Sequence, residues 1–140
     1  MTALDRDTIK EKLIKMEKYI RELEEIKPDT YSNYKSNQIT KYAIERLIQL
    51  VVDLALDINN HIIKEAGKYP ANDYFNSFIE LIELGILTEN FAYEIAPSTG
   101  LRNRLVHEYE EVNEKIVYKS IDKTISYYKK YVKEIYNYLR

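Results

Sequence analysis

A short polar segment late in the chain carries the residues best suited to chemistry. The ordinary pKa of histidine lies near neutrality, so His107 could act as a general base or a general acid. Arginine stays charged and holds phosphate through two parallel hydrogen bonds, which suits Arg102 or Arg104 to stabilising a developing phosphorane. Asn103 and Tyr109 could orient either group. Such a set needs no metal ion, and it suits RNA, because the 2′-hydroxyl of RNA can attack the adjacent phosphate once a base removes its proton.

If this segment is helical, its candidate residues do not all lie on the same face of the helix. At ~100° per residue, the step from Arg102 to His107 turns ~140°, so the two side chains do not share one face of an ideal helix. Asn103 does share a face with His107, and Arg102 aligns with Tyr109. The length of the arginine, a frayed last turn at His107, or a site built between two subunits across a two-fold axis could bring the pair together. On spacing alone, surface salt bridges with the neighbouring glutamates are the alternative.

A second polar line is expected on the long helix upstream, where Arg46, Asp53 and Asn60 recur every seven residues. One interpretation is a solvated helix face. The other is that Arg46 and Asp53 line the same cleft as Arg102, with Asp53 positioning an arginine. We expect His61 to pack or to cap near the end of this helix, where histidine interacts favourably with the helix dipole.

The spacing of helix-breaking residues predicts that helices position all of these groups. Only three glycines and three prolines interrupt the 140 residues, and apolar residues between them recur at three- and four-residue intervals. We expect helices from Asp7 or Thr8 to Lys27, from 37 to 66, from Asp73 to Gly85, from Thr88 to a break at Pro97 and Gly100, and from Asn113 to the C-terminus. The polar stretch 28–37 is expected to be a loop. The predicted fold is all-α, an up-and-down bundle of four to five helices in a single domain over residues 1–140.

The same periodicity predicts the inner face of each long helix. On the first helix it consists of Ile9, Leu13, Met16, Ile20 and Leu23. On the second it consists of Ile39, Ala43, Leu47, Leu50, Val51, Leu54, Ile58 and Ile62. On the last it consists of Ile116, Ile121, Ile125, Tyr128, Val132, Ile135 and Leu139. The fourteen tyrosines become more frequent toward the C-terminus. We expect them to contribute to both the core and a dimer surface there, rather than to a base-stacking platform.

Composition limits the class of protein. A formal charge of −2 excludes a strongly basic surface for nucleic acid but leaves room for a local basic cleft. The absence of cysteine excludes thiolate metal sites, and only two histidines leave little material for a histidine-based metal centre. The N-terminus has no apolar stretch like a signal peptide, and the most apolar segment, 47–58, is shorter than the ~20 residues that span a bilayer. We therefore expect a cytoplasmic protein without a membrane segment.

A longer string resembles a known family. The segment Gly100-Leu-Arg-Asn-Arg-Leu-Val-His-Glu-Tyr109 resembles the signature of the HEPN superfamily, specifically its HepT-like branch with Arg-x4-His-x-Tyr. The long second helix is similar to that branch as well, through 43–49, Asp53 and 60–62. Element order and length also fit, so the resemblance covers essentially the whole chain and is most specific at 100–109.

The resemblance implies an α-helical homodimer that acts as a metal-independent endoribonuclease without a cofactor. It implies the toxin of a type VII-like pair, whose antitoxin is a minimal nucleotidyltransferase. Arg102, Asn103 and His107 correspond to the catalytic residues of the family motif. Tyr109 corresponds to the tyrosine that the antitoxin modifies with AMP, a bulky anion that would block RNA by occupancy and by charge repulsion. The alternative function is a non-catalytic helical module that binds a nucleotidyltransferase partner or a nucleotide.

Overall fold

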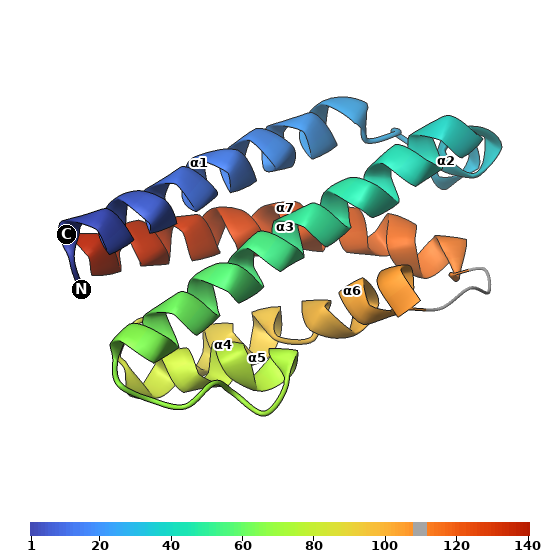
Figure 1. Ribbon diagram of the computed structural model, residues 1–140. Coiled ribbons are helices and arrows are strands. Elements are labelled where there is room, and N and C mark those ends of the chain that lie inside the picture. Colours follow the sequence, from blue (N-terminus) through green and yellow to red (C-terminus); the bar gives the residue numbers. More distant parts are fainter. Residues whose placement is uncertain (108–111) are drawn as a thin grey trace.

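Seven α-helices make up the part of the chain that the computed structural model describes, residues 1–107 and 112–140 (Figure 1). They are α1 (Ala3–Ile26), α2 (Tyr31–Ser36), α3 (Gln38–Glu65), α4 (Tyr74–Glu83), α5 (Glu89–Ile95), α6 (Ser98–His107) and α7 (Glu114–Leu139). No strand occurs in these two ranges. The all-α prediction is confirmed, although the chain is divided into more helices than the four to five that periodicity indicated.

Side-chain oxygens cap six of the seven helices at their first turn, which fixes where those helices begin. The expected starts at Asp73, Thr88 and Asn113 are confirmed as N-caps. The first helix begins earlier than predicted, because Thr2 accepts a hydrogen bond from the backbone of Asp5 and the Asp5 carboxylate accepts one in return. This reciprocal pair satisfies two N–H groups that would otherwise lack partners at the helix start.

The predicted loop over 28–37 is wrong, because it contains the short helix α2. Thr30 caps α2 and Asn37 ends it, so the turn-forming residues lie at its ends. Tyr34 is buried on α2, and its ring lies 6.4 Å from that of Tyr31 and 5.5 Å from that of Tyr118 on α7. Aromatic packing against a distant helix stabilises a segment whose local sequence resembles a loop.

The three long helices form the body of the bundle, with α1 packed along α3 and α7 (Figure 1). The two ends of the chain meet, and the Arg6 guanidinium donates a hydrogen bond to the Leu139 carbonyl there. The predicted inner face of α1 is buried in full. α4 and α5 pack against each other and lie near one end of α3, while α6 runs between them and the start of α7 (Figure 1). Across the described residues, no helix is both long and apolar enough to cross a membrane.

The predicted inner face of α3 is partly wrong. Ile39 is 82% exposed and Ala43 is exposed, whereas Ile44 and Ile48 are buried in their place. α3 contacts α1, α2, α4, α6 and α7, so its buried surface is wider than one stripe and turns around the helix along its length. At the start of α7, Ile116 is 40% exposed rather than buried. The rest of that helix's predicted face is buried or half-buried, including Tyr128.

Candidate functional site

The predicted catalytic residues lie on α6, which is held in place by its first turn. Pro97 separates α5 from α6, as expected, whereas Gly100 lies inside the helix rather than at the break. The Ser98 hydroxyl donates to the Ile95 carbonyl, and its oxygen lies 2.6 Å from the Tyr128 hydroxyl of α7. Burial raises the pKa of Tyr128, so this phenol stays protonated at neutral pH. Thr99 and Leu101 are also buried, whereas Arg104 and His107 are exposed.

Arg102 is held by three neighbours. Its Nε lies 2.5 Å from Oδ1 of Asp53 on α3, and its Nη1 donates to the Asn103 side-chain oxygen over 3.2 Å. The guanidinium carbon lies 5.1 Å from the centre of the Tyr74 ring, within cation–π range. The pairing of Asp53 with an arginine, one of the two interpretations of the polar line on α3, is therefore present.

The Arg102 side chain keeps hydrogen-bonding capacity for an anion. Arginine carries five N–H donors. Asp53 and Asn103 use one each, and the other donors have no partner within 1–107 and 112–140. The side chain is 13% exposed, so an anion that reached those donors would meet them largely shielded from water. Because charge-assisted bonds strengthen away from water, this position suits the stabilisation of a phosphate.

A shallow cavity of about 490 Å³ is bordered by Asn103 and Tyr74, two of the residues that hold Arg102. It is lined by Asn72, Asp73, Tyr74, Asn103, Arg104 and His107. Asn103 links the two features, since it accepts from Arg102 and lines the cavity with His107. Tyr74 of α4 also links them, because its ring lies near the guanidinium and the residue lines the cavity. The structure thus groups Asn103, Arg104 and His107 around one open cavity, with Arg102 held next to it by its contacts with Asn103 and Tyr74.

Two of the three ways in which Arg102 and His107 could come together do not occur within the single chain. α6 stays helical to His107, so this turn is not frayed. The Arg102 side chain turns toward Asp53 rather than reaching toward His107. In the single chain, Asn103 accepts a hydrogen bond from Arg102 and lines the same cavity as His107.

Some predicted site residues lie elsewhere or outside the described ranges. Arg46 is exposed on α3 and is absent from the residues that line the cavity. Tyr109 lies outside the described residues. Tyr74 and Asn72 were not singled out by the sequence, which offered no signal for them beyond the turn at Asn72.

His61 belongs to a separate cluster at the far end of α3. Its Nε2 lies 3.0 Å from Oδ1 of Asp5 and 4.0 Å from the carboxylate of Glu65. Hydrogen bonds from Thr2 and His61 lower the pKa of Asp5. Asp5, His61 and Glu65 could offer ligands to a metal, because their ligand atoms lie within 4.8 Å of one another. Asp5 already serves the α1 cap and the His61 pair, and these contacts account for the arrangement without an ion.

Comparison with known proteins points to one family. The family model described as ribonuclease HepT-like matches residues 16–135. The tRNA nuclease HepT of Aphanizomenon flos-aquae (strain 2012/KM1/D3) is 36% identical over 139 residues, which covers 99% of this chain and 95% of that protein. The mRNA nuclease HepT of Shewanella oneidensis is 25% identical over 111 residues, 79% of this chain and 83% of that one.

Solved structures share the fold. The tri-AMPylated Shewanella oneidensis HEPN toxin in complex with MNT antitoxin superposes with a TM-score of 0.84 at 21% identity. The superposition covers 98% of this chain and 99% of the toxin chain. The HEPN-like helical architecture expected from the motif is therefore confirmed.

Proposed function

The chain belongs to the HepT-like ribonuclease family, and from this premise we propose that it is a cytoplasmic endoribonuclease toxin that cleaves RNA without a metal ion. The observation that carries the proposal is the arrangement on α6. Arg102 contacts Asn103, and Asn103 lines the same cavity as His107. Residues 1–140 form a single catalytic domain in this proposal, and no cofactor takes part.

The reaction follows from the chemistry of these groups. His107 takes the proton of the ribose 2′-hydroxyl while water protonates the leaving 5′-oxygen, or His107 protonates that oxygen while water takes the 2′-hydroxyl proton. The 2′-oxygen bonds to the adjacent phosphorus and the bond from phosphorus to the 5′-oxygen breaks, leaving a cyclic phosphate and a free hydroxyl. Arg102 stabilises the charge on the phosphorane through its remaining N–H donors. Asn103 orients the phosphate or His107.

We propose that the chain acts as a homodimer. The ~140° between Arg102 and His107 on α6 favours a cleft to which two copies contribute. The first turns of α3 support this, because Ile39 is 82% exposed and Tyr42 is 63% exposed. A second copy packed there would bury the apolar residues that the single chain leaves in solvent. Arg46 lies on the same exposed stretch and would then join the cleft, as one interpretation of the sequence expected.

The partner in this proposal is a cognate minimal nucleotidyltransferase antitoxin. The structural neighbour is described as a tri-AMPylated toxin bound to an MNT antitoxin. Tyr109, two residues after His107, is the proposed acceptor of AMP in this chain. An AMP group on Tyr109 adds negative charge, which would repel the RNA phosphates.

Replacing Tyr109 with phenylalanine is expected to prevent AMP addition, because the phenol oxygen is the proposed acceptor. The chain is incubated with ATP and its cognate nucleotidyltransferase, and its intact mass is measured. Wild type and the control Tyr69→Phe, which alters a tyrosine that is 93% exposed, should gain one or more AMP units. A Tyr109→Phe chain that gains the same mass would place the acceptor elsewhere.

The test of the ribonuclease proposal is cleavage of RNA in the presence of a chelator. Protein whose intact mass shows no AMP is incubated with tRNA, mRNA and total RNA. We expect cleavage that persists in excess EDTA, because no step uses a metal ion. Loss of cleavage in EDTA would contradict metal independence. Failure to cleave any of the three substrates would favour the non-catalytic module that binds a nucleotidyltransferase or a nucleotide.

A further inference from the structure

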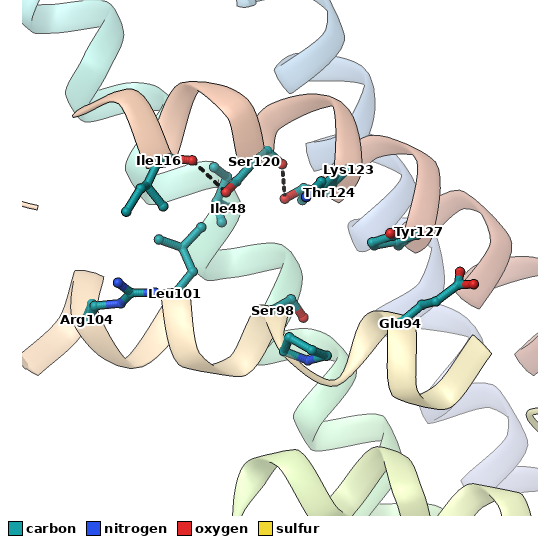
Figure 2. A pocket seen from close by; sticks show the side chains of 11 residues that line it. Ile48, Glu94, Ser98, Leu101, Arg104, Ile116, Ser120, Lys123, Thr124 and Tyr127 are labelled. Atoms are coloured by element: carbon teal, nitrogen blue, oxygen red, sulfur yellow. Dashed lines mark hydrogen bonds between the residues drawn. The ribbon is translucent and has the colours of Figure 1, made fainter. Parts of the chain in front are cut away.

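A second cavity, of about 290 Å³, lies between α6 and α7 (Figure 2). We call it the α6–α7 groove. Leu101 of α6 and Ile116 of α7 point toward each other across it, with Ile48 of α3 behind them. Glu94 of α5 and Tyr127 of α7 lie at one end, and Arg104 lies at the other.

Arg104 connects this groove with the candidate catalytic cavity, because it lines both. Helical geometry explains the double role. At ~100° per residue, Arg104 lies ~60° from Leu101 on one side and ~60° from His107 on the other. Arg104 therefore stands between the groove-facing side of α6 and the side that carries His107. A ligand that contacts Arg104 in the catalytic cavity can continue directly into the groove.

The groove combines groups that match a nucleotide. Arg104 and Lys123 supply positive charge, and both are exposed without a partner in the described ranges. The hydroxyls of Ser120 and Thr124 donate to backbone carbonyls one turn earlier, which leaves their oxygens able to accept hydrogen bonds. These oxygens suit the hydroxyls of a ribose.

The remaining lining suits a base. Leu101 and Ile116 form an apolar wall, and the half-buried ring of Tyr127 offers a surface for stacking. The Glu94 carboxylate at the far end can accept from an exocyclic amino group. A volume of about 290 Å³ is near the lower end of small-molecule sites, which begin at about 300 Å³.

We propose that the α6–α7 groove binds one nucleotide of single-stranded RNA adjacent to the scissile phosphate. Arg104 holds the phosphate between the two cavities, Lys123 holds the next phosphate, and the base enters between α6 and α7. The proposal rests on the ribonuclease function proposed above and adds where the neighbouring nucleotide lies. Single strands are favoured because only an unpaired base can leave its stack and enter such a groove.

Charge reversal at Lys123 tests the phosphate contact, with Lys15→Glu as a matched control. Lys15 is an exposed helical lysine on α1, away from the described cavities, so both variants change net charge equally. Initial rates are measured on an end-labelled single-stranded RNA at several salt concentrations. We expect Lys123→Glu to raise KM about tenfold and to flatten log KM against log salt by about 0.7, the slope for one phosphate contact on a single strand. Lys15→Glu should match wild type in both.

Filling the groove tests the base contact. Ser120→Phe places a ring between α6 and α7, and it also removes one of the two hydroxyls proposed to contact the ribose. We expect this variant to cleave the same RNA at different positions, because the nucleotide next to the cut no longer enters the groove. Fragment ends are mapped for wild type and variant, with circular dichroism as a check on folding.

The outcomes separate this proposal from the ribonuclease proposal. If wild type cleaves RNA and Lys123→Glu matches Lys15→Glu in KM and salt dependence, the groove does not bind RNA. Unchanged fragment ends in a folded Ser120→Phe chain would exclude base binding there. If wild type cleaves no RNA, the ribonuclease proposal fails, and fluorescence anisotropy of the same labelled RNA with the two lysine variants still decides whether the groove binds it.

Discussion

Replacing His107 with alanine is expected to slow RNA cleavage by about 10²- to 10⁴-fold, the usual contribution of a general acid or base. The fold should be unaffected, since His107 is exposed at the last residue of α6 and has no hydrogen bond or ion pair with residues 1–107 or 112–140. Substitutions at such positions change the free energy of unfolding by about 0.5 kcal/mol or less. The measurement is the cleavage rate of purified, unmodified protein, with a thermal melt of each chain.

The matched control is His61→Ala, because the chain contains only two histidines. His61 pairs with Asp5 at the far end of α3, so this change should lower stability slightly and leave cleavage near the wild-type rate. A His107→Ala chain that cleaves as fast as His61→Ala would remove His107 from the mechanism. A His61→Ala chain as slow as His107→Ala would mean that histidine loss acts through stability.

Replacing Arg102 with alanine is expected to slow cleavage by about 10²- to 10³-fold, the cost typical of losing one group that stabilises developing charge. Arg102→Lys should recover little, because an ammonium group cannot reproduce the planar fork that contacts Asp53 and a phosphate together. Arg21→Ala, which removes an exposed arginine from α1, is the control for the loss of charge. The single-turnover cleavage rate of each variant, with RNA bound at saturation, distinguishes catalysis from binding.

Asp53 is expected to act through Arg102 as a positioning residue. Asp53→Asn should slow cleavage about tenfold, and in the Arg102→Ala background it should have little further effect, because coupled residues are not additive. A full additional loss in the double variant would show that Asp53 acts independently of Arg102. Unchanged cleavage in Asp53→Asn would show that Asn103 and Tyr74 suffice to hold the guanidinium in place.

In these proposals, AMP addition and RNA binding involve residues that are close together in the sequence at the end of α6. Tyr109 follows His107 closely in sequence, and Arg104 lines both cavities. An AMP group on Tyr109 carries a phosphate, which is the group that Arg104 would bind in RNA. Modification and substrate would then compete for one arginine, so the effect of AMP should be strongest on RNA binding rather than on folding.

Features that depend only on residues close together in the sequence could be predicted without a structure. The expected helix starts at Asp73, Thr88 and Asn113 are correct: all three are N-caps, and a cap involves only residues within one turn. The inner face of α1 was also correct, since that helix buries a single narrow stripe. The motif at 100–109 identified the family, because its specificity lies in the order of residue types and not in their positions in space.

The contacts that build the sites, and the buried side of α3, depend on how the helices pack against one another. Asp53 and Arg102 are 49 residues apart, so their ion pair depends on how α3 crosses α6. α3 carries apolar residues on more than one side, and only its contacts with α1, α2, α4, α6 and α7 determine which side is buried. Tyr74 and the α6–α7 groove arise in the same way, from surfaces of different helices that meet. Periodicity and capping are short-range properties of the chain, whereas a site is made by long-range contacts whose geometry only the tertiary structure specifies.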